Sequence, residues 1–127
     1  MTRNRKAMLD LLLSADEPLA AADVHGRMGA GIDQATIYRT LHYLEEKGFA
    51  ESFILHCESH GTKRYYTASG SDSAHVHHHW FHCERCHRFT DLGNCKMDAL
   101  LGEYERDTGI EIKTHTLYMT GICAKCR

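Results

Sequence analysis

The chain has 127 residues and a formal net charge of −2, with 43% hydrophobic and 25% charged residues. This composition excludes disordered and fibrous proteins, and the length allows one domain or two very small ones. A net charge near zero gives no overall positive field for nucleic acid, so any DNA binding must come from a local patch. Eleven histidines and six cysteines are the unusual counts.

No apolar run approaches the ~20 residues that a membrane-crossing helix needs. The first residues are basic and lead into an amphipathic pattern without a small-residue cleavage site, so they are not typical of a signal peptide. We therefore expect a cytoplasmic protein with no membrane partner. In a reducing compartment the cysteines favour thiolate chemistry or metal binding over disulfides.

The first half of the chain predicts three helices and a β-hairpin. Apolar residues recur at helical spacing in three segments, residues 8–13, 20–28 and 34–47. The third segment is the best marked, because Asp33 is a good N-cap and Gly48 suits the left-handed position after a helix. Two β-prone runs follow, at residues 49–55 and 64–67. Three short helices and a hairpin predict a winged helix-turn-helix domain over residues 1–70.

The second half, residues 71–127, predicts a separate small domain. Residues 69–74 have the only linker-like composition of the chain and mark the boundary. Periodicity then predicts a strand, a helix and a last strand, over residues 75–83, 97–108 and 110–121. The predicted fold class is therefore α+β, with helices and strands in both halves.

Four of the six cysteines form two CxxC pairs, Cys83 with Cys86 and Cys123 with Cys126. Two intervening residues let one turn direct both sulfurs at one ion, and two such turns complete a tetrahedral zinc site of structural type. The alternatives are two separate redox motifs or unrelated buried thiols. Cys57 and Cys95 have no partner in this scheme and are interpreted as ordinary thiols.

A run of histidines precedes the first CxxC pair. On a strand, alternate side chains share a face, so His77 and His79 point one way and His78 points the other way. Asp98 on the predicted helix and His115 on the last strand would complete a nitrogen and oxygen set that suits zinc, iron or manganese. A single histidine is more often a surface residue, but several adjacent ones favour a metal site.

Taken together, these motifs resemble the ferric uptake regulator family of metal-dependent bacterial repressors. The match runs through residues 35–41, 44–48 and 77–79, both CxxC pairs and His115, and it covers nearly the whole chain. The resemblance implies a homodimer with an N-terminal DNA-binding domain and a C-terminal α/β dimerisation domain. It also implies structural Zn²⁺ and a second metal site, on Cys83, Cys86, Cys123 and Cys126 and on His77, His79, Asp98 and His115.

The family usually has a third site, a hinge sensor between the domains, and here the sequence departs from it. His78 and Asp91 match two of its positions. The other positions hold poor ligands, namely Pro18, Tyr66 and Trp80. Either local residues such as His56, Cys57, His60 or His75 replace the missing ligands, or this site is weak and the other sites sense the metal. His56 and His60 are equally interpretable as plain polar residues of the wing. His87 is a further departure, because the family commonly has glycine there.

The third predicted helix is the recognition helix of the helix-turn-helix, whose N-terminal part faces base edges in the major groove. Candidate DNA contacts on it and on nearby basic segments are Gln34, Thr36, Tyr38 and Arg39, with Arg5, Lys63 and Arg64. For Tyr38 the alternative is packing within the domain, since Ile37 and Leu41 already define a core side. The resemblance favours Tyr38 and Arg39 as contacts to a double-stranded, pseudo-palindromic operator.

These features predict a metal-dependent repressor of metal-homeostasis genes. The nitrogen-rich ligand set and the two spare cysteines favour zinc as the sensed metal, ahead of Fe²⁺ and of peroxide sensing at bound iron. An enzyme is not expected, because a zinc hydrolase would need a general base of the HExxH type and the chain has none. A metal-storage or chaperone protein is the remaining rival, and it would bind metal without binding an operator.

Overall fold

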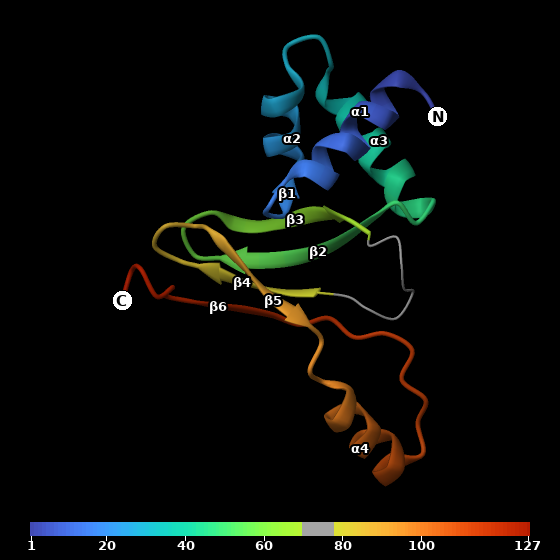
Figure 1. Cartoon of the computed structure of the whole chain (residues 1–127), viewed down its shortest axis with the longest axis vertical. Helices are drawn as coiled ribbons and strands as arrows, with labels where there is room; N and C mark the ends of the chain where they lie inside the picture. Colours follow the sequence, from blue (N-terminus) through green and yellow to red (C-terminus); the bar gives the residue numbers. More distant parts are fainter. Residues whose placement is uncertain (70–77) are drawn as a thin grey trace. The chain divides into compact units, whose positions relative to one another are not determined.

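The computed structural model describes residues 1–69 and 78–127 of the chain. It contains two compact units, Met1–Ser71 and Asp72–Arg127. Each unit has its own three-stranded sheet (Figure 1). No helix within the described ranges combines the length and the apolar character that a membrane crossing needs.

The first unit consists of three helices and three strands. They are α1 (Arg3–Ser14), β1 (Leu19–Ala20), α2 (Ala21–Met28), α3 (Gln34–Glu46), β2 (Ala50–Cys57) and β3 (Gly61–Ala68). The sheet has the order β1-β3-β2, and both pairings are antiparallel. The three helices gather on one side of this sheet (Figure 1), which is the arrangement of a winged helix-turn-helix.

The core of the first unit lies where the helices meet one another and the sheet. All three helices contribute apolar side chains to it, namely Met8, Leu12, Val24, Ile37, Leu41 and Leu44, and Leu19 of β1 and Tyr66 of β3 pack with them. The buried positions of α3 recur three or four residues apart. One face of α3 is therefore packed inside the unit, and the opposite face is left for solvent or a ligand.

The two residues predicted to bound the third helix do so. Asp33 Oδ1 accepts a hydrogen bond of 2.8 Å from the backbone amide of Thr36, which satisfies an otherwise unpaired donor of the first turn. Hydrogen bonds from Thr36 lower the pKa of Asp33, and more weakly so does the charge of Arg39. At the other end Gly48 has φ of 81°, a conformation that only glycine adopts without steric cost.

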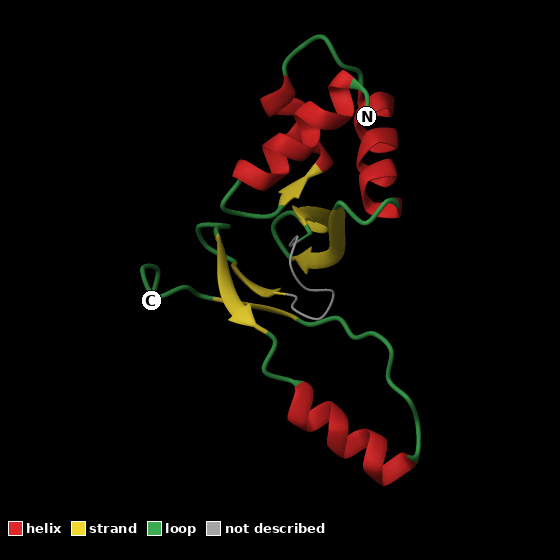
Figure 2. Cartoon of the chain, turned by 45° about the vertical axis from the view of Figure 1, so that its right-hand side comes forward, coloured by secondary structure: helices red, strands yellow, loops and turns green. Residues whose placement is uncertain are grey.

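The second unit is a smaller sheet with one helix. Its elements are β4 (His78–Cys83), β5 (Phe89–Asn94), α4 (Asp98–Thr108) and β6 (Tyr118–Gly121). The strand order is β5-β4-β6, with β4 antiparallel to β5 and parallel to β6. The chain between β5 and β6 therefore crosses from one edge of the sheet to the other, and it carries α4 on the way. This helix has no buried residue, and it stands apart from the strands of its own unit (Figure 2).

The α+β fold class predicted from the sequence is confirmed, but several strands have other bounds than predicted, and β1 and β5 were not predicted. The last strand is confined to Tyr118–Gly121 instead of residues 110–121, because its pairing with β4 extends only that far. The two-residue β1 is too short to leave a periodic signal, and β5 interrupts its apolar pattern with Asp91 and Gly93. Of the strand predicted over residues 75–83, the first three residues lie outside the described residues.

Candidate metal centres and DNA-binding surface

The sulfur atoms of the two CxxC pairs converge in the second unit. All four, from Cys83, Cys86, Cys123 and Cys126, lie within 4.8 Å of one another. The parallel pairing of β4 with β6 explains this, because the C-terminal ends of parallel strands lie at the same end of a sheet. One pair begins at the last residue of β4, and the other begins two residues after the end of β6.

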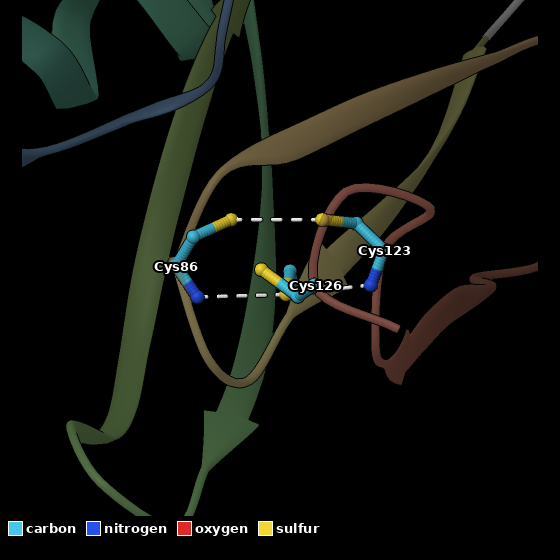
Figure 3. Close-up of side chains that lie close together, drawn as sticks. Cys86, Cys123 and Cys126 are labelled. Carbon is cyan, nitrogen blue, oxygen red and sulfur yellow. Dashed lines mark hydrogen bonds between the residues drawn. The ribbon is translucent and has the colours of Figure 1, made fainter.

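The spacing of the sulfurs fits a tetrahedral zinc ion. The Sγ atoms of Cys86 and Cys123 are 3.8 Å apart, and with Cys126 they point toward one another (Figure 3). Zn–S bonds of about 2.3 Å at tetrahedral angles hold two sulfurs about 3.8 Å apart. A disulfide would need about 2.05 Å, and all six cysteines are free thiols. Donor type and separation therefore both suit zinc.

Backbone amides prepare one of these sulfurs to carry negative charge. The amides of Cys86, Cys123 and Arg85 donate to Cys83 Sγ at 3.5, 3.4 and 3.4 Å. They lower the pKa of the Cys83 thiol to about 5, against the opposing effect of burial. Hydrogen bonding to Cys123, together with burial, raises the pKa of Cys126 to about 12. Protons held among the sulfurs in this way are the ones that a bound divalent cation displaces.

A second group in the same unit contains His79, Cys95 and His115, whose ligand atoms also lie within 4.8 Å of one another. The predicted second site contained His77, His79, Asp98 and His115. The structure brings His79 and His115 together, and His77 lies outside the described residues. Asp98 is exposed at the first residue of α4, and among the described residues it is not part of the group. Cys95, interpreted from the sequence as an ordinary thiol, is part of it.

The residues considered for a hinge sensor are found in both units. In the second unit His78 Nδ1 and Asp91 Oδ2 are 2.8 Å apart, on partly exposed side chains. In the first unit Cys57 is buried at the end of β2, and His60 is exposed in the turn that follows. His75 lies outside the described residues. Within the second unit, the structure brings His78 and Asp91 of this predicted set into direct contact.

The outward face of α3 presents the predicted DNA-contacting residues. Gln34, Tyr38 and Arg39 are exposed, and Arg39 Nη2 donates to Thr36 Oγ1 at 3.3 Å. Tyr38 has 57% of its surface exposed, which excludes the alternative that it packs inside the unit. A recognition helix needs an outward face of this kind.

The predicted basic residues of the first unit lie on α1 and on the wing, which is the hairpin of β2 and β3. The guanidinium carbon of Arg5 is 3.6 Å from the centre of the Tyr43 ring, a cation–π contact that orients it. Lys63 and Arg64 are exposed on β3. Arg64 Nη1 donates to Ser52 Oγ at 2.9 Å. These three cations supply the local positive charge that the net charge of the chain conceals.

Comparisons with known proteins agree over the length of the chain. The model of the ferric uptake regulator family matches residues 1–120. The ferric uptake regulation protein of Neisseria meningitidis is 33% identical over 131 residues, which cover 100% of this chain and 85% of that protein. The zinc uptake regulation protein of Mycobacterium tuberculosis is 30% identical over 129 residues, which cover 99% and 93%.

Solved structures of regulators of this kind share the fold of the chain. A solved zinc uptake regulator, complexed with zinc and DNA, aligns with 98% of this chain and 81% of its own length, with a TM-score of 0.68 and 22% identity. At 22% identity, this structural similarity establishes that the two proteins share a fold.

A winged helix in one unit and clustered metal-ligand side chains in the other define a metal-responsive transcription regulator. The chain belongs to the ferric uptake regulator family, whose members are regulators and not enzymes. The family resemblance found in the sequence is thereby confirmed. Relatives named for iron and for zinc both match, so the preferred metal must be inferred from the ligands of this chain.

Proposed function

We propose that the chain is a metal-dependent repressor of metal-homeostasis genes, and that zinc is the metal it senses. One observation carries the proposal. A winged helix with an exposed recognition face shares the chain with a unit that gathers thiol and imidazole groups into two clusters. The alternatives are an iron-responsive or peroxide-responsive regulator of the same family and, more remotely, a storage or chaperone protein that does not bind an operator.

The four-cysteine cluster is assigned to structural Zn²⁺. Four thiolates fill the coordination sphere of zinc and leave no position for a reacting molecule. The second unit has few buried apolar side chains, because α4 has no buried residue and the residues of β6 are exposed or half-buried. In such a small unit, metal binding supplies folding free energy that a core would otherwise provide. Cys83 and its three partners therefore hold the sheet end together.

The proposed division of labour follows the two units. Residues 1–70 bind DNA, and residues 71–127 bind metal and form a homodimer. Exposed large apolar side chains in the second unit support dimerisation, namely Leu92, Leu100, Tyr104, Ile110, Tyr118 and Met119. A two-fold dimer would present two α3 helices to successive major grooves of a pseudo-palindromic operator. Six free thiols suit the reducing cytoplasm, where we place the protein.

The regulatory metal is assigned to the imidazole-containing group of the second unit. The set predicted from the sequence, His77, His79, Asp98 and His115, accepts zinc, Fe²⁺ or Mn²⁺. Zinc is preferred because thiols as well as imidazoles surround this part of the unit. His78 and Asp91 are retained as candidate hinge ligands, together with His75, Cys57 and His60 from the sequence.

Operator binding tests the proposal. An operator fragment selected from genomic DNA is titrated in a gel-shift assay with protein whose four-cysteine site holds zinc, in the presence of a mild chelator or of added Zn²⁺, Fe²⁺ or Mn²⁺. We expect tight binding with zinc and weak binding with chelator. Equal affinity in both would contradict a metal-dependent repressor, and a preference for iron would replace zinc as the sensed metal.

A further inference from the structure

We propose that Cys95 is a thiolate ligand of the regulatory metal ion, and that with His79 and His115 it forms a site whose donor atoms favour zinc over manganese. This inference rests on the proposed function only in calling the ion regulatory. The assignment of the ligands depends on geometry alone. It also changes the predicted ligand set, because Cys95 takes the part given to the carboxylate of Asp98.

The three ligand atoms have the spacing of a coordination polyhedron. His79 Nε2 and His115 Nε2 are 3.3 Å apart, and Cys95 Sγ is 3.3 Å from His115 Nε2. Tetrahedral zinc with Zn–N bonds of about 2.0–2.1 Å and a Zn–S bond of about 2.3 Å separates two nitrogens by about 3.3 Å and a nitrogen from a sulfur by about 3.6 Å. Small movements would therefore bring all three onto one ion.

The surrounding backbone orients two of these ligands for metal binding. His79 Nδ1 is 3.0 Å from the carbonyl oxygen of Leu117. A carbonyl only accepts, so Nδ1 carries the proton and the lone pair of the neutral ring lies on Nε2, which faces the group. The backbone amide of Met97 donates to Cys95 Sγ at 3.4 Å, which holds the sulfur in place beside the imidazole of His115. His79 is 6% exposed, which restricts the competition from water.

The three ligands come from three separate segments of the unit. His79 lies in the central strand β4, Cys95 lies between β5 and α4, and His115 lies between α4 and β6. The last two ligands therefore bracket α4, a helix without buried residues that stands apart from the sheet. An ion bound here would fasten both ends of the α4 crossover to β4. Its occupancy would then control the position of the exposed apolar side chains of α4.

The donor set decides which metal is preferred. Two imidazoles and a thiolate are ligands that suit zinc, whereas carboxylates suit manganese. Asp98 lies in the first turn of α4, where a carboxylate interacts favourably with the helix dipole without any metal. An exposed helix-terminal aspartate thus has a simple structural role, while Cys95 is half-buried against an imidazole.

Cobalt spectroscopy tests the assignment. The dimeric full chain is prepared with zinc in the four-cysteine site and titrated with Co²⁺, and the sulfur-to-cobalt charge-transfer absorption is followed for the unaltered protein and for Cys95→Ala, Asp98→Asn and Lys96→Ala. We expect Cys95→Ala to abolish this absorption and to weaken cobalt binding by about tenfold or more. Asp98→Asn and the neighbouring control Lys96→Ala should retain both. Full absorption in Cys95→Ala, or its loss only in Asp98→Asn, would overturn the proposal.

A measurement on the unaltered protein covers the case in which Cys95→Ala fails to fold. Iodoacetamide labelling of Cys95, read by peptide mass, should be fast with the four-cysteine zinc alone and at least about tenfold slower after a second equivalent of Zn²⁺. Unchanged labelling would overturn the assignment. Gel shifts separate the two proposals. If zinc protects Cys95 from labelling but DNA binding does not depend on metal, Cys95 remains a ligand and the regulatory role of the site is wrong. If DNA binding depends on metal but zinc does not protect Cys95, the proposed function stands and Cys95 is not a ligand.

Discussion

Cys83 lies opposite Gly121 in the parallel pairing of β4 with β6, and this register brings the two CxxC pairs to one end of the sheet. The second pair begins two residues beyond Gly121. Because side chains alternate across a strand, a shift of one residue would turn the sulfurs away from each other. The strand register therefore sets up the four-cysteine cluster.

Cys123→Ser should release the structural zinc and unfold the second unit. The variant removes one of four ligands, and little apolar burial remains to hold the fold. The checks are zinc content of the purified chain and the cooperativity of thermal unfolding. Lys125→Ala, in the same turn but with all four sulfurs kept, is the control and should keep the zinc. Full zinc content and an unchanged melting profile in Cys123→Ser would contradict the assignment of the site.

Asp33→Ala should lower the melting temperature of the first unit at neutral pH and have less effect in acid. The folded-state pKa of Asp33 lies below its ordinary value of 3.8, so its contribution is fully present above that value and is lost as pH falls through the lowered pKa. Asp33→Asn, which keeps a capping oxygen, should lower the melting temperature less than Asp33→Ala does. Thermal melts of all three chains at pH 7 and pH 3 measure this. If Asp33→Ala lowers the melting temperature by the same amount at both pH values, the charge of Asp33 does not contribute to stability.

Tyr38→Ala should weaken operator binding with little change in stability, because the side chain is largely exposed on the outward face of α3. Ile37→Ala, one residue away but 1% exposed, should instead destabilise the unit by about 2–5 kcal/mol. Paired gel shifts and urea unfolding curves separate the two effects. A Tyr38→Ala protein that binds operator normally would remove this residue from the interface.

Lys63→Ala should weaken binding to operator and to random DNA by similar factors. A cation on the wing meets phosphates, which carry no sequence information. Removing one cation that neutralises a phosphate should reduce the slope of log affinity against log salt by about 0.9. Lys113→Ala, an exposed lysine in the second unit, is the control and should leave the slope unchanged. Equal slopes for Lys63→Ala and the control would place the wing away from the DNA backbone.

Local signals made the first unit predictable. Asp33, Gly48 and the apolar spacing of α3 act within one helix, so a pattern in the sequence is enough to find it. The CxxC pairs were equally visible, because two ligands at a fixed short spacing come from one turn. Family membership followed from the order of these motifs.

The features that the sequence did not predict depend on long-range contacts. Cys95 meets His79 and His115 only after the crossover around α4 has formed, and no periodicity marks it. The short β6 is set by how much of β4 it pairs with. His87, noted as a departure from the glycine common in the family, has φ of 62°, so it adopts the left-handed conformation that favours glycine.

The most direct test of the central claim is the thermodynamic link between metal and DNA. With the four-cysteine zinc in place, zinc affinity of the second cluster is measured with and without operator, and operator affinity with and without zinc. A coupled regulator requires both ratios to be equal, at roughly 5–150-fold. Two ratios near one would contradict the account.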